Sequence, residues 1–345
     1  MSPDHRCLLE EHGLSPEWRL ACKSKAESDL ALEVGQYEAM IQADESPFTF
    51  EAGTGFGIAV DLGTTTLIAQ LVDLSNAKVL AVETALNPQR RWGSDLISRV
   101  ESALDGNASL LTDSIRKELG SMLLKLTGKK KVPIERIVLV GNTVMHHLFC
   151  DLDVKPLAFY PFESPELDMK RFRAEELGWD VRCKEILFYP SIGSFVGSDI
   201  LAGIFATGMW HKEELSVLVD LGTNGEIVVG NREGILCAST AAGPAFEGAR
   251  ISSGMLATAG AISSLRIQEG KFQCKVIGNV PARGICGSGL IDAVAEVLVH
   301  GQLGEFGEIL SGDAAIKLTR EVLLTARDIQ EFQLAKAAIA AGLSI

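Results

Sequence analysis

Apolar positions are concentrated in residues 57–72, where an apolar run leads into Asp61 and a second, β-rich run follows a glycine turn. Helical periodicity is weak there, so the pattern predicts a β-hairpin. Gly63 lets a ligand approach the tip without a Cβ in the way. The tip also offers backbone N–H groups and the hydroxyls of Thr64, Thr65 and Thr66. It therefore suits the terminal phosphates of a nucleotide, with Asp61 holding a magnesium ion through water.

The same pattern recurs in residues 215–230, where an apolar run leads into Asp220 and a second Asp-Leu-Gly-Thr turn. A long internal repeat indicates duplicated structure, so we expect two similar domains whose tips grip a phosphate chain between them. Asp220 is again the candidate magnesium-binding carboxylate. The phosphate-binding positions of this tip are predicted to be Gly222, Thr223, Asn224 and Gly225. One such turn is a weak signal, but two of them, each followed by a β-run and helices, are a strong one.

Strand and helix patterns complete the first predicted domain. Residues 78–86 indicate a third strand, and Ser94 is predicted to cap a helix with one apolar face made of Leu96, Ile97, Val100 and Leu104. A second helix is predicted over 113–127, with Ile115, Leu119, Met122, Leu123 and Leu126 facing inward, and a short apolar strand over 137–140 follows it. The Gly-Asn-Thr turn at 141–143 then opens a helix whose N-terminus can hold an anion.

The remaining elements are less regular. Residues 151–190 are marked by prolines and are expected to be irregular and to wrap the domain surface. A helix over 199–209 is predicted to have Ser198 as its cap and Leu201, Ile204 and Phe205 on its inner face. A strand is expected over 234–238. It is followed by a helix capped by Ser288, with its apolar positions at Leu290, Ile291, Val294 and Leu298. A final helix is expected from about residue 326 through Leu334, capped by Thr325 with Asp328 near the third position.

Two stretches rich in glycine and small residues lie in the second half, at residues 239–248 and 284–292. Such residues let the backbone come close either to another element or to a ligand. The first stretch either packs tightly between domains or lines a nucleotide cleft, with Gly243 as a binding position. The second either seats an anion, with Gly287 at the helix start, or is an ordinary helix start. Glu247, the one charged residue of the first stretch, is a candidate catalytic group that polarises water.

Composition narrows the class of partner. The chain has 345 residues, 47% of them hydrophobic, and a net charge of −13 without a long basic run. This argues against nucleic acid or an acidic membrane surface as the main partner. No apolar run is long enough for a membrane span, and no signal peptide is recognisable at residue 1. The chain has seven cysteines, none in a C-x-x-C pair, which predicts a reduced cytoplasmic protein.

The histidines and most cysteines are interpreted as packing residues. His146 and His147 are adjacent, so on a helix their side chains point about 100° apart and are not placed to share one metal ion. We therefore expect them to pack or to face a substrate. Four thiols without partner spacing are predicted to lie in the core: Cys150, Cys183, Cys237 and Cys274. Cys286 needs no redox role.

The duplicated tips resemble the phosphate motifs of the superfamily that contains acetate and sugar kinases, heat-shock chaperone ATPases and actin. One branch is closer: the ATP-dependent reductive activators of corrinoid proteins. They carry runs similar to Gly-Asn-Thr-Val-Met-His-His at 141–147, Ala-Ala-Gly-Pro-Ala-Phe-Glu-Gly at 241–248 and Gly-Ile-Cys-Gly-Ser-Gly-Leu-Ile-Asp at 284–292. The resemblance covers roughly residues 14–345, and these three motifs are specific to the branch.

The resemblance implies an α/β fold with duplicated actin-like, ribonuclease-H-like ATPase lobes. It also implies a function, the ATP-dependent reduction of a corrinoid protein from Co(II) to Co(I) with electrons from an iron–sulfur cluster. ATP and magnesium are then the expected cofactors, Asp61 and Asp220 position the ion, and a corrinoid protein is the expected partner. Oligomeric state is left open, with a homodimer as one possibility.

The resemblance also predicts the domain organisation. Residues 1–35 resemble the closing segment of a plant-type ferredoxin, in which Cys22 would be one [2Fe–2S] ligand without its three partners; an ordinary buried cysteine is the alternative. We expect the cluster in full-length relatives only. A linker over 36–56 leads to a first lobe over 57–210 and a second over 211–345. The second lobe is expected to be incomplete, so that the chain is interpreted as a fragment of the family's full length.

Two other functions fit the same motifs. The first is a sugar or carboxylate kinase of the same superfamily, which needs a general base; Asp95, Asp199 and Glu226 are the candidates. The second is a fragment that binds a corrinoid protein without turnover. Phosphorylation of a small acceptor would favour the kinase, and partner binding without nucleotide binding would favour the fragment.

Overall fold

The computed structural model describes residues 50–93, 95–128 and 132–345. The predicted ferredoxin remnant, Cys22, most of the predicted linker and Ser94 lie outside these residues. Residues 50–55, at the end of that linker, are exposed and form no helix or strand. None of the helices in the described residues combines the length and apolar composition that a membrane span requires.

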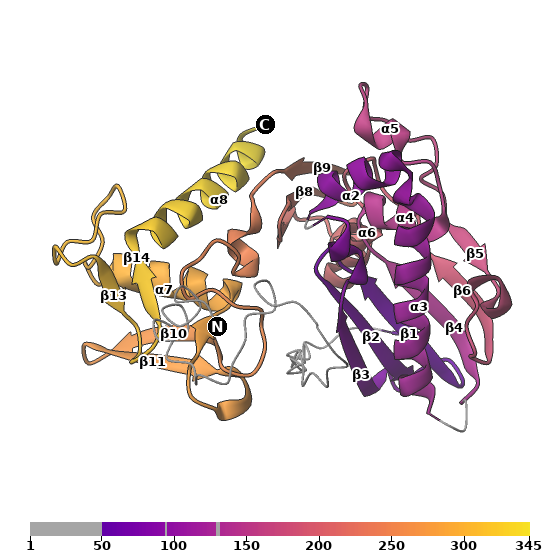
Figure 1. Cartoon of the computed structure of the whole chain (residues 1–345), viewed down its shortest axis with the longest axis horizontal. Helices are drawn as coiled ribbons and strands as arrows, with labels where there is room; N and C mark the ends of the chain where they lie inside the picture. The colour runs from indigo at the N-terminus through magenta and orange to yellow at the C-terminus, as the bar shows by residue number, and fades with distance from the viewer. Residues whose placement is uncertain (1–49, 94, 129–131) are drawn as a thin grey trace, which may run out of the picture. The chain divides into compact units, whose positions relative to one another are not determined.

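A six-stranded sheet forms the centre of the first half, in the order β3-β2-β1-β4-β6-β5 (Figure 1). Its strands are β1 (Phe56–Leu62), β2 (Thr66–Asp73), β3 (Lys78–Leu86), β4 (Ile134–Val140), β5 (Lys170–Phe172) and β6 (Cys183–Phe188). The predicted hairpin is the antiparallel pair β1–β2, and the predicted third strand has the expected bounds. β4 pairs with β1 and β6 in parallel. Alternation along β1 buries Ile58, Val60 and Leu62 on one face and leaves Ala59 and Asp61 on the other.

Helices cover the buried face of this sheet. They are α2 (Leu96–Ser102), α3 (Ala108–Thr127) and α4 (Thr143–Cys150), with a π-helical turn, η3 (Ala103–Asn107), between the first two. α3 crosses the sheet (Figure 1), and its own residues Leu119 and Met122 are fully buried, as predicted. Thr112 reaches across from α3 and donates a hydrogen bond to the carbonyl of Leu148 in α4, at 2.7 Å. Together these contacts make the core that supports the β1–β2 tip.

The predicted α2 face is partly wrong. Asp95 caps this helix in a reciprocal capping box with Ser98. Val100 is buried as expected, but Ile97 is 74% and Leu104 is 41% exposed. The π-helical turn explains Leu104, because an extra residue per turn rotates the residues within it away from the preceding face. Ile97 lies in the first turn, on the outer side of the helix.

The expectation that residues 151–190 are irregular is also wrong. They contain α5 (Lys155–Ala158), β5, the 3-10 turn η4 (Ala174–Leu177) and β6. Ile186 and Phe188 of β6 are buried, so this strand belongs to the central sheet rather than to a surface wrapping. The sequence obscured it because β6 has only three consecutive apolar residues after a charged pair.

The second half repeats the hairpin and adds smaller elements. α6 (Ser198–Thr207) and η5 (Met209–His211) lead to an antiparallel sheet of β7 (Ser216–Leu221), β8 (Gly225–Asn231) and β9 (Gly234–Thr240). The later elements are η6 (Pro244–Glu247), β10 (Ala261–Gln268), β11 (Lys271–Val276), η7 (Ile277–Asn279), β12 (Gly284–Ile285), α7 (Gly287–Val299), β13 (Ala315–Lys317), β14 (Leu323–Thr325) and α8 (Ala326–Ser344). A short turn, η2 (Pro88–Arg91), follows β3 in the first half.

Two predicted caps in this half are wrong and one is confirmed. Ser198 and Ser288 lie inside α6 and α7, and their hydroxyls bond the backbone of Gly141 and Ser263 instead. Thr325 does cap α8, in a capping box with Asp328. Three predicted apolar-face positions also differ: Leu201 is half-buried, and Phe205 and Leu298 are exposed. Phe205 packs against Trp210 of η5, with the ring centroids 5.8 Å apart.

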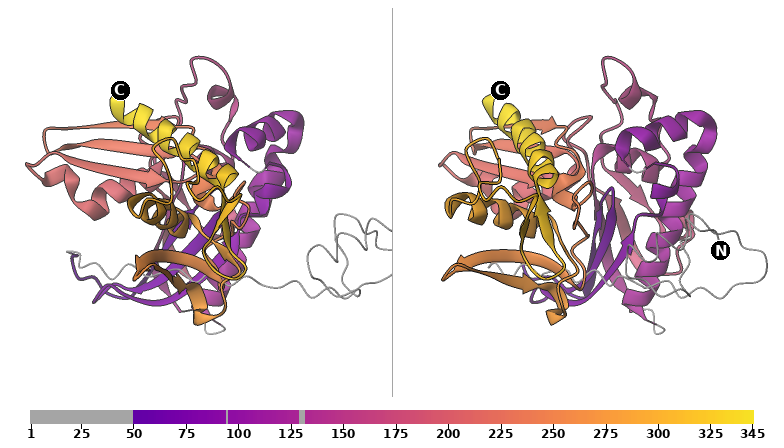
Figure 2. Two further views of the ribbon diagram at one scale, coloured as in Figure 1. Left: turned by 90° about the vertical axis from the view of Figure 1, so that its left-hand side faces the viewer. Right: turned by 60° about the vertical axis from the view of Figure 1, so that its left-hand side comes forward.

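α8 packs along the second hairpin (Figure 2). Ile339 of α8 fills the space beside Gly225 so closely that a Cβ there would lie 1.9 Å from its Cδ1 atom. Gly342 likewise leaves room for Ile227 of β8. A separate small cluster joins α6 to this sheet through Ile200, Ile204 and Val228. The second tip is therefore held from both sides by packed helices.

Candidate functional site

The first tip is a tight turn between β1 and β2. The Gly63 N–H donates to the carbonyl of Thr66 at 3.1 Å. A Cβ at Gly63 would lie 2.5 Å from that same oxygen, so a larger residue would push the turn open. Glycine is therefore required at this position because the turn closes on itself there.

Three side chains from other elements fix this tip from behind. Asn87, after β3, donates through Nδ2 to the Gly63 carbonyl at 2.9 Å. Arg99 of α2 donates through Nη2 to the Thr64 carbonyl at 2.6 Å. Asn142, the cap of α4, donates through Nδ2 to the Thr64 hydroxyl at 3.1 Å. Preorganised backbone of this kind is what phosphate binding requires.

The sequence patterns did not identify Asn87 and Arg99 as residues that hold the first tip in place. Arg99 is fully buried, beside the buried Val100 of the same helix. Burial lowers its pKa to about 10, and the Asp95 and Glu247 carboxylates partly offset this, so it is a cation at neutral pH. A lone arginine on an apolar helical face was the available signal.

The second tip has a turn one residue shorter than the first and a different support. The Gly222 N–H donates to the Asn224 carbonyl at 3.0 Å. Gly243, with φ of 79°, donates its N–H to the Thr223 carbonyl at 2.9 Å. The small-residue stretch therefore packs directly against the tip, which fits both the packing and the cleft-lining alternatives.

Glu247 joins the two tips. Its Oε2 atom accepts a hydrogen bond from the Thr65 hydroxyl at 2.6 Å. Its Oε1 atom accepts from the Thr223 N–H at 3.0 Å and from the Thr223 hydroxyl at 2.7 Å. Both oxygens of this carboxylate are engaged by tip residues that were predicted to bind phosphate. The sequence identified Glu247 as a candidate but gave no sign of this bridge.

Four carboxylates gather beside the tips, and we call Asp61, Asp199, Asp220 and Glu226 the acidic cluster. Asp61 reaches solvent, yet the surrounding protein raises its pKa to about 7, helped by the charges of Asp199 and Asp220. Burial also raises the pKa of Asp199 to about 6 and that of Glu226 to about 7, and it raises the pKa of Asp220. Burial is the main cause of these shifts, and repulsion between the carboxylates adds to it for Asp61, Asp199 and Glu226. Carboxylates with strongly raised pKa values are concentrated at functional sites.

The predicted roles of single residues can be compared with their surroundings. Asp95 is a helix cap, which accounts for its carboxylate without a role as a base. Asp199 and Glu226, considered above only as kinase bases, lie in the acidic cluster. Within the described parts of the chain, no group of three or more His, Cys, Asp or Glu side chains is arranged to hold a metal ion. Magnesium usually keeps several waters and one or two carboxylates, so water-mediated binding by Asp61 and Asp220 stays a prediction.

Gly287 and Gly225 contact protein rather than open space. A Cβ at Gly287 would lie 1.6 Å from the carbonyl oxygen of Phe246, one residue before Glu247. Two of the three branch-specific motifs therefore pack backbone to backbone here. This contact supports the packing alternative for the second stretch, and a nucleotide-binding role for Gly287 remains a prediction.

Replacing Gly287 by alanine is expected to destabilise the fold by about 3 kcal/mol, because backbone must move to relieve the overlap with Phe246. Urea unfolding measures the free-energy change. Gly234→Ala is the matched control, since nothing lies within 4 Å of a Cβ at that position. Equal stability of the two variants would show that the α7 start is loosely packed.

The paired histidines are packing residues, as expected. His147 bonds the Thr143 carbonyl through Nδ1 at 2.8 Å and the Ser164 hydroxyl through Nε2 at 2.7 Å. His146 packs edge-on against Phe188, with ring centroids 4.9 Å apart. Burial lowers the pKa of His146 to about 4, so it is neutral at pH 7. Cys150, Cys183, Cys237 and Cys274 are half-buried free thiols whose pKa burial raises, and Cys286 is a buried free thiol.

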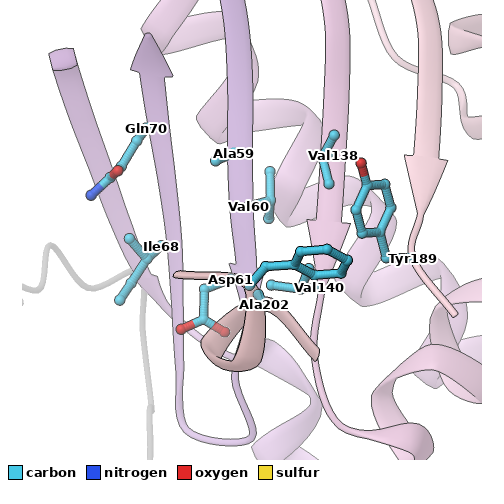
Figure 3. A pocket seen from close by; sticks show the side chains of 10 residues that line it. Ala59, Val60, Asp61, Ile68, Gln70, Val138, Val140, Tyr189 and Ala202 are labelled. Atoms are coloured by element: carbon cyan, nitrogen blue, oxygen red, sulfur yellow. The ribbon is translucent and has the colours of Figure 1, made fainter. Parts of the chain in front are cut away.

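A pocket of about 610 Å³ adjoins Asp61 on the sheet face opposite α3 (Figure 3). Its walls are mainly aliphatic, and Asp61, Gln70 and Tyr189 supply its polar side chains. A sugar needs many convergent hydrogen-bonding groups, which this wall does not offer. The pocket therefore gives no support to the sugar kinase alternative.

Two regions of the chain match one known protein family. Residues 56–212 match the RACo middle region, and residues 214–345 match the C-terminal domain of RACo, the ASKHA domain. The second match gives residues 214–345 the ASKHA domain of that family. The structure is accordingly a mixed α/β fold with an ASKHA-type C-terminal domain.

Individual relatives agree with the match. The corrinoid activation enzyme RamQ of Eubacterium limosum is 33% identical over 319 residues, covering 83% of this chain and 54% of the relative. The [Co(II) methylated amine-specific corrinoid protein] reductase of Methanosarcina barkeri is 28% identical, covering 83% and 58%. A solved reductive activator for corrinoid, iron–sulfur protein superposes with a TM-score of 0.74 and 33% identity, over 85% of this chain and 51% of that one.

The chain thus spans about half the length of the relatives it matches. Both halves of the described structure match parts of one family, and the solved relative shares the fold over most of the chain. On this sequence and structural similarity, the chain belongs to the RACo family of corrinoid reductive activators.

Proposed function

We propose that this chain is the nucleotide-binding part of an ATP-dependent reductive activator of a corrinoid protein. Family membership supports the activity, and the names of the relatives support a corrinoid protein as the partner. The observation that carries the proposal is the meeting of both tips at Glu247, beside the acidic cluster.

The residues present suit a magnesium–nucleotide complex. The hydroxyls of Thr64, Thr65 and Thr66 and the backbone at Gly63 would bind phosphate oxygens from the first tip. Thr223, Asn224, Gly222, Gly225 and Gly243 would do so from the second tip. Asp61 and Asp220 would hold the ion through water, and Asp199 and Glu226 add negative charge around it. Magnesium would supply the positive charge that both the carboxylates and the phosphates need.

The role of ATP in this proposal is mechanical rather than redox. Tips that bind the same phosphate chain are drawn together, so a nucleotide favours one arrangement of the two lobes over others. The reaction served is the transfer of one electron to Co(II), which gives Co(I), from a reduced iron–sulfur cluster that becomes oxidised. The cobalt belongs to the partner's corrinoid. Cys22, the candidate cluster ligand, lies outside the described residues.

The proposal predicts that a Co(II) corrinoid protein binds this chain and that Mg-ATP changes its affinity about fivefold or more, since both ligands select among lobe arrangements. Corrinoid proteins from the source organism can be titrated with and without Mg-ATP by calorimetry. Asp61→Asn serves as the control that should lose the ATP effect while retaining the partner surface. Binding to no corrinoid protein, together with phosphorylation of a small sugar or carboxylate, would instead establish a kinase.

A further inference from the structure

The bridge at Glu247 uses the donors that a bound phosphate would need. The Thr65 hydroxyl, the Thr223 hydroxyl and the Thr223 N–H each carry one proton, and all three donate to this carboxylate. None of them can serve a phosphate oxygen fully at the same time. Glu247 in this position and a phosphate held by both tips therefore exclude each other.

We propose that Glu247 is an internal occupant of the phosphate seat, which links the two tips and must be displaced when a nucleotide binds. The inference rests on the proposed function, because it takes nucleotide phosphate as the competing ligand. It assigns Glu247 a gating role in binding, distinct from polarising water. The carboxylate imitates a phosphate in its charge and in its use of two acceptor oxygens.

Both the charge near Glu247 and the backbone beside it would allow a nucleotide to displace this side chain. Arg99 lies buried behind the first tip and interacts with the charge of Glu247. A phosphate can take over this attraction with a larger negative charge. Glu247 ends the short turn η6, which is flanked by Gly243 and Gly248 at φ of 79° and 78°. A Cβ at Gly243 would meet nothing within 4 Å, so one side of the turn has open space beside it.

Exchange of Glu247 for a nucleotide would have a structural consequence. The contact between Thr65 and Glu247 is a hydrogen bond from the first tip to the second half of the chain. Displacing it breaks that link and replaces it with links through the phosphate chain. Nucleotide binding would thus change what joins the lobes, and this gives ATP a way to alter the partner-binding surface.

Glu247→Gln tests the inference, because glutamine keeps the size but removes the charge and one acceptor oxygen. Affinity for ATP, ADP and tripolyphosphate is measured by calorimetry with and without magnesium. If Glu247 blocks the seat most of the time, the substitution should tighten binding of all three ligands about 3–10-fold. Glu233→Gln removes the same charge from the exposed β8–β9 turn and should leave affinity unchanged.

Two further measurements keep the outcome decisive. Glu247→Asp retains the charge but is too short to reach both tips, and it should also tighten binding. Hydrogen exchange at the Thr223 amide should be faster in Glu247→Gln than in wild type and should slow when tripolyphosphate is added. Unchanged or weaker affinity in both Glu247 variants, with normal wild-type binding, would overturn the inference alone. No binding of any of the three ligands by wild type or variants would overturn the proposed function and this inference with it.

Discussion

Asp61→Asn is expected to weaken Mg-ATP binding about 100-fold while leaving the unliganded protein slightly more stable. Asp61 is surrounded by protein and by the charges of Asp199 and Asp220, which together raise its pKa to about 7. Removing its charge relieves repulsion within the acidic cluster. Because Asp61 reaches solvent, which screens that repulsion, the gain is expected to be only about 0.5–1 kcal/mol. A variant that is more stable but binds Mg-ATP more weakly would show that the Asp61 carboxylate serves to bind a cation rather than to stabilise the fold.

The pH dependence follows from the same pKa values. The carboxyl groups with pKa of about 6 to 7 bind protons more tightly when folded than when unfolded. Their contribution to stability is therefore present at low pH and is lost as the pH rises toward 7. Over pH 6 to 8 the cluster loses these protons, so magnesium binding should strengthen and its stabilising effect should grow.

Calorimetry and thermal unfolding at pH 6, 7 and 8 would measure both effects. Asp313→Asn is the matched control, because this exposed aspartate lies far along the chain from the tips. Asp220→Asn should reproduce the loss of binding. Wild-type affinity in both cluster variants would show that the two tips are structural turns rather than ligands of a magnesium–nucleotide complex.

Arg99→Met is expected to destabilise the fold by about 2–4 kcal/mol and to weaken nucleotide binding as well. Methionine keeps most of the apolar volume but leaves the carbonyls of Thr64 and Gly93 without their donor. Buried carbonyls that lose a charged donor cost about 1–3 kcal/mol each. The first tip would then lose the contact that fixes its backbone at Thr64.

Urea unfolding and ATP calorimetry on the same variant would separate the two effects. Arg136→Met provides the control, because its side chain is 55% exposed and pairs with Glu185 at the surface. Exposed pairs of this kind contribute roughly 0–1 kcal/mol. Should Arg99→Met match the control in stability, the hydrogen bonds to the tip would not be needed to hold it.

The sequence by itself determined the duplicated hairpins and their tips. Each apolar run forms the first strand of its predicted hairpin. In the first turn the glycine is required locally, because a Cβ at Gly63 would lie 2.5 Å from the Thr66 carbonyl oxygen, whereas a Cβ at Gly222 would meet nothing closer than 3.4 Å. Thr325 as a cap was readable for the same reason, since its partner Asp328 is three residues away. Features that depend only on residues within one turn of backbone can be predicted without knowing how the rest of the chain packs.

Helix faces were only partly determined. Leu119 and Met122 were read correctly because α3 is long and its apolar stripe is continuous. Ile97 and Phe205 were not, since an apolar residue at the right spacing is buried only if another element covers it. Strand β6 was missed because a parallel central strand is recognised by its neighbours, which come from distant parts of the chain.

Only the tertiary structure decided how the site is assembled. Asn87, Arg99 and Asn142 converge on the first tip from three different elements. Glu247, 182 positions along the chain from Thr65, connects that tip to the second one. Asp199 and Glu226 join Asp61 and Asp220 by the same folding. A sequence shows which residues can bind phosphate or a cation, because that is a property of each side chain. Which of them share a charge or a hydrogen bond depends on distances that exist only once the sheets and helices have packed.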